Sequence, residues 1–247
     1  MHRLLEPFAR DPGASAVLLD IDGTLAPIVA RPDLAVVPGG TLATVSRLAA
    51  RFGLVACVTG RSLADGRGLV PVDGVVIVGN HGLEWQDGDH VGMPPGVAAR
   101  RDVLRELLPA IGGCADVVGA RLEDKGVIAA LHFRGLEDPD GARERAERIL
   151  APTVAGSGLA LRRGRHVLEV APDVGVDKGT AVRALREAHD VRRALYAGDD
   201  LTDRDGFREA DVAIAVASDE TPPEVLAAAD LVVQGPAELA ALLATLT

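Results

Sequence analysis

The chain has 247 residues, 48% of them hydrophobic and only 2% aromatic, and its formal net charge is −10. This length allows one large domain or two modest ones, and an acidic chain without a basic stripe argues against nucleic acid and anionic membranes as partners. No apolar run reaches the length of a membrane span, residues 1–7 lack a signal-peptide core, and the two cysteines suggest no disulfide framework. We therefore expect a cytoplasmic protein. We also expect a monomer.

The first part of the chain alternates apolar runs with segments of helical spacing. The runs at residues 16–20, 54–58 and 75–78 lack polar alternation, which is typical of buried strands in a parallel sheet. Residues 41–51 carry apolar side chains at helical spacing, and Ser62 can cap a further helix. Strands that alternate with helices predict an α/β fold with a doubly wound, Rossmann-like parallel sheet.

The pattern changes after residue 92. We predict a helix over 96–111, strands over 117–122 and 127–133, a helix over 139–150, and a hairpin of strands 159–162 and 166–170 around a turn at 163–165. A helix and a hairpin, twice over, predict a small α+β domain with an antiparallel sheet. The predicted division is therefore core residues 1–92, an inserted domain at 93–172, and core residues 173–247.

The alternating pattern then returns. It predicts a helix over 178–189, strands over 194–197, 212–216 and 231–233, and a last helix over 237–246. These elements complete the parallel sheet of the core.

Polar side chains lie where three of the predicted core strands end: Asp20 and Asp22, then Thr59, then Asp199, Asp200 and Asp203. The carboxyl ends of parallel strands share one edge of the sheet, where such folds bind ligands. Two like charges 4 Å apart repel by about 4 kcal/mol at an effective dielectric constant near 20, so gathered carboxylates need a cation. Magnesium suits a few carboxylates combined with water and phosphate. The alternatives are a simple turn at Asp20–Asp22 and helix capping by Asp200 or Asp203.

Lysine is rare in this chain. Only Lys125 and Lys178 occur among 26 lysines and arginines, so a position that keeps lysine can be one that needs a compact ammonium group. Surface placement is the alternative for each.

Four motifs resemble those of the haloacid dehalogenase superfamily of phosphohydrolases: Asp20-Ile-Asp22-Gly-Thr-Leu, Val58-Thr59-Gly-Arg61, Lys178, and Gly198-Asp199-Asp200-Leu-Thr-Asp203. Further segments resemble the trehalose-6-phosphate phosphatase family within it: Gly79-Asn-His81-Gly-Leu-Glu84, Glu123-Asp-Lys125-Gly126, Val167-Leu-Glu169-Val and Val176-Asp-Lys178-Gly-Thr. The resemblance covers nearly the whole chain. The chain departs from the family pattern at Arg204, where an acidic residue is usual, and at Ala171, where many members carry arginine.

The resemblance implies a phosphatase that acts on a small sugar phosphate, trehalose 6-phosphate, through an aspartyl phosphate. Asp20 would be the nucleophile and Asp22 the general acid and base, while Thr59 and Lys178 would hold the phosphoryl oxygens. Mg²⁺ would be bound by Asp20, the backbone carbonyl of Asp22 and Asp199, supported by Asp200 or Asp203. The inserted domain would be a cap that selects the sugar through Glu123, Lys125 and Glu169, with Arg61 and His81 as further substrate contacts.

Three other functions remain open at this point. The same chemistry can serve another sugar phosphate, such as a glucosylglycerate, mannosylglycerate or pseudo-disaccharide phosphate. A signalling receiver that stores an aspartyl phosphate also uses clustered Asp, Thr and Lys, but it has no use for Asp22 as an acid and base or for a long insert. A non-catalytic sugar-phosphate sensor is the third, and the intact set of motifs argues against it.

Overall fold

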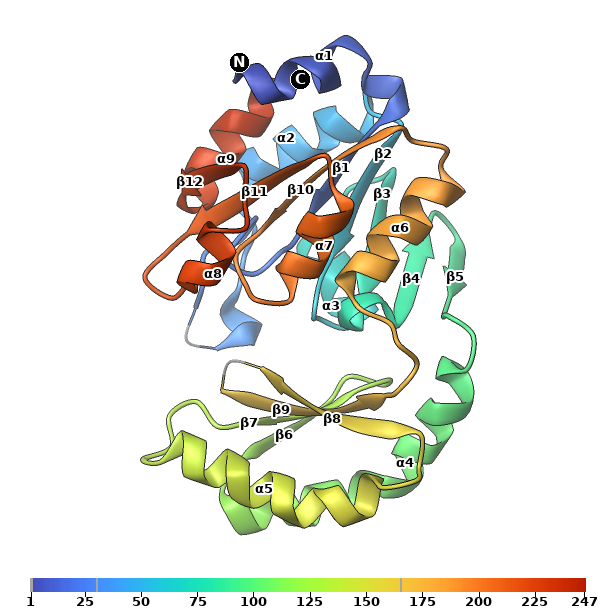
Figure 1. Ribbon diagram of the computed structural model, residues 1–247, viewed down its shortest axis with the longest axis vertical. Helices are drawn as coiled ribbons and strands as arrows, with labels where there is room; N and C mark the ends of the chain where they lie inside the picture. The colour runs from blue at the N-terminus through green and yellow to red at the C-terminus, as the bar shows by residue number, and fades with distance from the viewer. Residues whose placement is uncertain (1, 30, 165) are drawn as a thin grey trace. The chain divides into compact units, whose positions relative to one another are not determined.

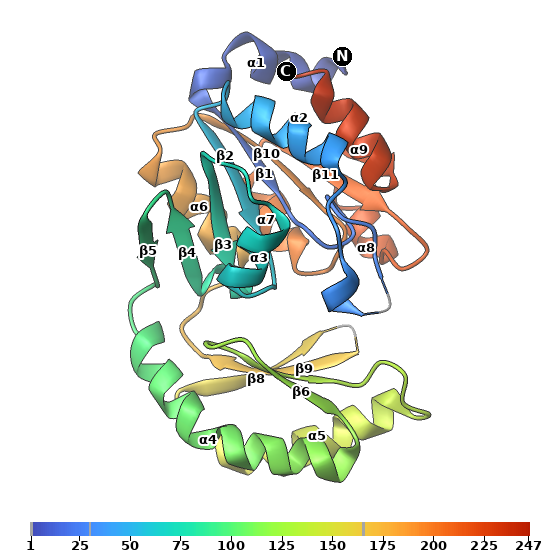
Figure 2. The ribbon, with the colours of Figure 1, turned by 180° about the vertical axis from the view of Figure 1, so that it is seen from behind.

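A computed structural model describes residues 2–29, 31–164 and 166–247 of the chain. It divides into two compact units, a core unit of Met1–Gly92 with Val176–Thr247 and an inserted unit of Met93–Gly175 (Figures 1 and 2). No helix in the described ranges combines the length and the apolar character that crossing a membrane would require.

The core unit is built on one sheet, which within the described residues has eight strands in the order β12-β11-β10-β1-β2-β3-β4-β5. Their bounds are β1 Ser15–Leu19, β2 Leu54–Val58, β3 Val75–Gly79, β4 Glu84–Asp87, β5 His90–Gly92, β10 Arg193–Gly198, β11 Val212–Ala217 and β12 Leu231–Gln234. The strands from β12 to β3 are parallel, and β4 and β5 add an antiparallel hairpin at one edge. The predicted α/β doubly wound core is confirmed.

Helices cover both faces of this sheet. They are α1 Glu6–Arg10, α2 Gly39–Ala49, α3 Leu63–Leu69, α6 Lys178–Ala188, α7 Asp203–Glu209, α8 Pro223–Leu226 and α9 Gly235–Ala244. Val17 and Leu19 point into the core shared with α1, α2 and α9, whereas Ala16 and Leu18 point into the core shared with α6, α7 and α8. Figure 1 shows α6, α7 and α8 on one face of the sheet, and Figure 2 shows α2 and α9 on the other. Because both faces are buried, the central parallel strands β1, β2, β3, β10 and β11 carry apolar residues at nearly every position.

The inserted unit contains a second sheet, antiparallel, with the described strands in the order β6-β7-β9-β8. The strands are β6 Arg121–Asp124, β7 Ala129–His132, β8 Leu159–Gly164 and β9 Val167–Pro172, and the helices are α4 Val97–Val118 and α5 Pro139–Val154. Both helices pack on one face of this sheet through a core that includes Leu104, Leu131 and Leu168. The turn predicted at 163–165 includes residue 165, which lies outside the described residues.

The strand predicted over residues 117–122 begins four residues too early, because β6 runs over Arg121–Asp124. Residues 117 and 118 belong to α4, which runs past Gly112 and Gly113 and ends at Gly119, where φ is +73°. The helix continues because Ile111, Cys114, Ala115 and Val118 keep a buried stripe at helical spacing. The hairpin of β4 and β5 was not predicted, although the Gly88-Asp89 pair between the two strands is typical of a tight turn.

Candidate functional site

The centre of the site lies where the order of the sheet reverses. From β1 the chain proceeds outward through β2 and β3 on one side, whereas β10, β11 and β12 occupy the other side. Asp20 directly follows β1 and Asp199 directly follows β10, the neighbouring strand. The backbone N–H of Asp20 donates to the carbonyl of Ala197 at 2.9 Å, which extends the ladder to this point. Open α/β sheets bind ligands at such a switch point.

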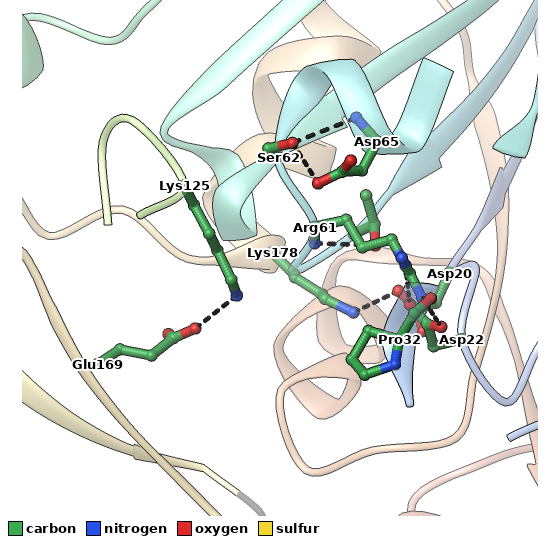
Figure 3. A network of polar contacts seen from close by, with 10 residues as sticks. Asp20, Asp22, Pro32, Arg61, Ser62, Asp65, Lys125, Glu169 and Lys178 are labelled. Carbon is green, nitrogen blue, oxygen red and sulfur yellow. Dashed lines mark hydrogen bonds and ion pairs between the residues drawn. The ribbon is translucent and has the colours of Figure 1, made fainter. Parts of the chain in front are cut away.

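Lys178 brings a buried positive charge to these carboxylates. It is the first residue of α6, whose start is fixed by Asp177 and Thr180 through reciprocal side-chain bonds to the backbone. The Nζ of Lys178 donates to Oδ1 of Asp20 at 2.8 Å and to Oδ1 of Asp203 at 2.6 Å, and the bond to Asp20 is visible in Figure 3. Because Lys178 is only 2% exposed, both bonds form away from water and hold the ammonium group in place.

Asp203 has a fully bonded carboxylate. Within the described chain, its Oδ1 accepts from Lys178 and from the hydroxyl of Tyr196 at 2.8 Å. Its Oδ2 accepts from the backbone N–H groups of Asp199 and Asp200 at 3.0 and 2.9 Å. These four donors match the capacity of an ionised carboxylate, so Asp203 orients both the lysine and the loop that carries Asp199.

Burial controls the electrostatics of this cluster. Burial raises the pKa of Asp20 above its ordinary value, against the lowering effect of Lys178, and burial together with the charge of Asp20 raises the pKa of Asp199. Burial acts to lower the pKa of Lys178, but the charges of Asp20 and Asp203 outweigh it and raise that pKa. The lysine therefore stays cationic, while the two carboxylates lack enough positive charge around them.

A divalent cation would supply the positive charge that Asp20 and Asp199 lack. Carboxylate oxygens of Asp20, Asp199 and Asp203 lie within 4.8 Å of one another; because Asp203 already accepts four bonds, Asp20 and Asp199 are the two that would hold the cation. Gly23 has φ +76°, and a Cβ atom there would come within 2.2 Å of Oδ2 of Asp199, so the loop after β1 can approach Asp199 only as glycine. A buried, oxygen-only set of ligands is the type that hard cations prefer, and a cation would favour the ionised carboxylates.

Asp22 is held by Arg61. The guanidinium donates to the two carboxylate oxygens of Asp22 from Nε at 2.6 Å and from Nη2 at 2.7 Å, and Nη2 also donates to the carbonyl of Pro32 at 2.9 Å (Figure 3). The Asp22 side chain is 42% exposed, in contrast to the buried Asp20. The structure thus pairs two residues that the sequence analysis assigned to different roles.

Thr59 and His81 belong to two loops that brace each other. Thr59 is buried, and its Oγ1 accepts from the backbone N–H of Arg61 at 3.2 Å. The backbone N–H of His81 donates to the carbonyl of Thr59 at 2.9 Å, and a Cβ atom on Gly60 would come within 2.5 Å of the His81 ring. The His81 side chain therefore packs on the turn that carries Thr59. The backbone of Asn80 and His81 has positive φ, so this loop adopts the left-handed conformation at both residues.

The remaining predicted residues lie on the inserted sheet. Lys125 Nζ donates to Oε1 of Glu169 at 3.0 Å, and both side chains are about one-tenth exposed, at 11% and 9% (Figure 3). Glu123 bonds Nε2 of His132 at 2.6 Å. This hydrogen bond is the main cause that lowers the pKa of Glu123 to about 2. The structure thus brings the three residues to one sheet: Glu123 lies in β6, Glu169 lies in β9 with β7 between them, and Lys125 directly follows β6.

Asp200 is partly buried, and its backbone bonds Asp203. Sequence reasoning missed Tyr196, the chain's only tyrosine, which lies in β10 and bonds Asp203. A lone phenol in an apolar strand directly before the Gly198 motif was the available signal, because a buried hydroxyl needs a partner. Burial raises the pKa of Tyr196 well above its ordinary value, so the phenol remains a donor.

Replacing Asp203 with asparagine tests the bonding around Lys178. In the Asp203→Asn variant, the buried Lys178 loses one ionised partner, and the new amide N–H₂ group faces N–H and O–H groups that are themselves donors. We therefore expect the free energy of unfolding to fall by about 3–5 kcal/mol. Urea denaturation measures this loss. Asp205→Asn is the control, because Asp205 forms an exposed pair with Arg208, where the loss should stay below about 1 kcal/mol. Equal losses in the two variants would contradict the assignment.

The Glu123–His132 pair predicts a pH effect. Because folding depresses the pKa of Glu123 from 4.5 to about 2, the pair adds stability above pH 4.5, and this contribution disappears as the pH falls toward 2. NMR titration of the Glu123 carboxyl should show the depressed value, and His132→Ala should return it toward 4.5, whereas His90→Ala, on the exposed strand β5, should leave it unchanged. An unaltered titration in His132→Ala would refute this cause.

The family model described as Trehalose-phosphatase matches residues 18–225. Trehalose-6-phosphate phosphatase of Escherichia coli (strain K12) is 36% identical over 215 residues, which cover 83% of this chain and 77% of that protein. Trehalose-phosphate phosphatase of Mycobacterium marinum is 36% identical over 203 residues, 78% of this chain and 50% of that protein.

The match to other relatives covers only part of their length. An uncharacterised glycosyl hydrolase of Mycobacterium tuberculosis is 35% identical over 204 residues, and the chain spans only 15% of its length. Among solved structures, the C-terminal domain of trehalose-6-phosphate phosphatase from C. albicans has a TM-score of 0.78 at 22% identity and covers 98% of this chain and 95% of that one. The similarity to the C. albicans structure concerns the fold alone. The family match and the E. coli relative together show that the chain belongs to the trehalose-phosphatase family.

Proposed function

We propose that the protein is a Mg²⁺-dependent phosphatase that hydrolyses trehalose 6-phosphate to trehalose and phosphate. The observation that carries this proposal is the buried group of Asp20, Lys178 and Asp199 at the switch point of the sheet, with Asp22 two residues after Asp20. Relatives that bear the name trehalose-phosphate phosphatase support the choice of substrate.

The reaction proceeds in two steps on the chain's own carboxylates. A carboxylate oxygen of Asp20 attacks phosphorus, the bond from phosphorus to the sugar oxygen breaks, and Asp22 gives its proton to that oxygen. Asp22 then takes a proton from water, whose oxygen attacks the phosphorus of the aspartyl phosphate, which releases phosphate and restores Asp20. Arg61 bonds both carboxylate oxygens of Asp22 and so orients the group that would give and take the proton.

The other residues of the core unit hold the phosphoryl group. Lys178 and Thr59 would donate to its oxygens, as fixed positive charge and fixed dipoles do in phosphoryl transfer. Mg²⁺ would be bound by Asp20, the backbone carbonyl of Asp22 and Asp199, with Asp200 nearby, and when bound it would neutralise the oxygens of the transferring group. We assign Asp203 a supporting role, because its oxygens already accept four bonds.

The inserted unit would select the sugar. Glu123, Lys125 and Glu169 offer charged hydrogen-bonding groups on one sheet face, which suits a ligand rich in hydroxyls. In the core unit, Arg61 and His81 would contact substrate or position those that do.

A cytoplasmic location and a monomeric state are part of the same proposal. Cys57 and Cys114 are both buried and unbridged, as is usual in a reducing compartment. Cell fractionation and light scattering test these two points.

A substrate panel tests the function. Phosphate release should be fastest with trehalose 6-phosphate and should disappear when EDTA removes the metal and return with added Mg²⁺. The panel includes glucosylglycerate, mannosylglycerate and pseudo-disaccharide phosphates. A flat profile, or a better substrate than trehalose 6-phosphate, would overturn the proposed specificity.

Two substitutions test the mechanism. Asp20→Asn should lower kcat by at least about 10³-fold, because the nucleophile is lost. Asp22→Asn should block turnover while Asp20 can still be phosphorylated, which intact-protein mass spectrometry detects. Asp65→Asn is the control, because Asp65 is exposed and bonds only Ser62 among the described residues. Full activity in Asp22→Asn would refute the mechanism.

A further inference from the structure

The inserted sheet has one face covered by helices and one that carries charge. Leu131, Leu168 and Val170 point toward α4 and α5. Strand side chains alternate, so the residues between them point the other way. On that second face lie three basic, two acidic and one histidine side chain: Arg121, Glu123, Lys125, His132, Arg162 and Glu169.

Four of the residues on this face form a straight row across all the described strands of the sheet. Glu123 lies opposite Ala130, Ala130 opposite Glu169, and Glu169 opposite Arg162. Neighbouring strands are about 4.8 Å apart, so the two glutamates are about 10 Å apart at the backbone, with only a methyl group between them. The row therefore ends in Arg162, one strand beyond the residues that the sequence motifs identified.

The charges on this face are paired except at that end. Glu123 bonds His132, and Glu169 bonds Lys125. Among the described residues, the one side-chain hydrogen bond of Arg162 runs from Nη2 to the carbonyl of Pro172 at 3.0 Å. A guanidinium has five N–H donors, so this bond fixes the group and leaves most of its donors for a ligand.

We propose that Arg162 is a further specificity-determining residue, which donates hydrogen bonds to hydroxyl groups of the sugar ring that does not carry the phosphate. This inference rests on the proposed function. A neutral sugar ring offers mainly hydroxyl groups, which both donate and accept, and charged partners make the stronger hydrogen bonds to them. Glu123 and Glu169 would accept hydrogen bonds from the ring, and Arg162 would donate hydrogen bonds to it. The row therefore supplies both the acceptors and the donors that sugar hydroxyl groups can bond.

Arg163 provides a matched control. It is the next residue of β8, and its side chain points to the helix face, where it pairs with Glu147 of α5. Arg162→Ala and Arg163→Ala thus remove the same side chain from the same strand on opposite faces. Arg162→Lys keeps the charge but has one nitrogen in place of the planar fork.

Steady-state kinetics with trehalose 6-phosphate and with glucose 6-phosphate, which lacks the second ring, test the inference. Arg162→Ala should raise KM for trehalose 6-phosphate about tenfold with kcat within about twofold, and should leave glucose 6-phosphate kinetics unchanged. Arg162→Lys should recover part of the loss, and Arg163→Ala should match the unmodified protein with both substrates.

Two results would overturn the role of Arg162: an unchanged KM for trehalose 6-phosphate in Arg162→Ala, or an equal change for both substrates, which would indicate a structural role at the sheet edge. Both results concern the Arg162→Ala variant. If the proposed function fails instead, the unmodified protein itself does not prefer trehalose 6-phosphate, so the two kinds of failure can be told apart. If the panel finds a different disaccharide phosphate as best substrate, the same variants are compared on that substrate, and an unchanged KM there overturns the inference.

Discussion

The ammonium group of Lys178, bound between Asp20 and Asp203, is the interaction on which the rest of the site depends. Three buried carboxylates at the end of two neighbouring strands would repel one another strongly without it. A single lysine cannot neutralise all of them, and this leftover negative charge is what makes the place suitable for a cation. Lysine suits the position because its charge is compact and its three N–H groups can reach carboxylates on separate loops.

Rigid loops around the lysine keep its partners in position. Asp203 ties Lys178 and Tyr196 to the backbone of Asp199 and Asp200, so α6, β10 and α7 share one polar centre. On the other side of β1, the turn that carries Thr59 is bonded to the loop of Asn80 and His81, and Glu84 accepts from Leu63 and Asn80. Groups fixed before a ligand arrives need no reorganisation when charge moves, which is the physical basis of electrostatic catalysis.

The sequence predicted the core of this arrangement because its signals are local. Apolar runs followed by Asp20, Thr59 and Asp199 identify strands and their ends, and parallel strands place those ends together. Tyr196, the Asp22–Arg61 pair and the register of Arg162 depend on contacts between segments distant in the chain, which no local pattern reveals. The predicted helix ends at residue 111, whereas α4 continues through Gly112 and Gly113, because packing of Ile111 and Cys114 outweighs the cost of glycine in a helix.

Tyr196 gives the protein a built-in reporter. It is the chain's only tyrosine, it is fully buried with its ring edge-on to Phe207, and its hydroxyl contacts the carboxylate that also binds Lys178. The tyrosine part of the near-ultraviolet absorption therefore comes from a single place in the molecule, which is linked to Asp20 through Asp203 and Lys178; Trp85 accounts for the rest of the strong absorption. Difference spectroscopy of the unlabelled protein can follow events at this centre without interference from another phenol.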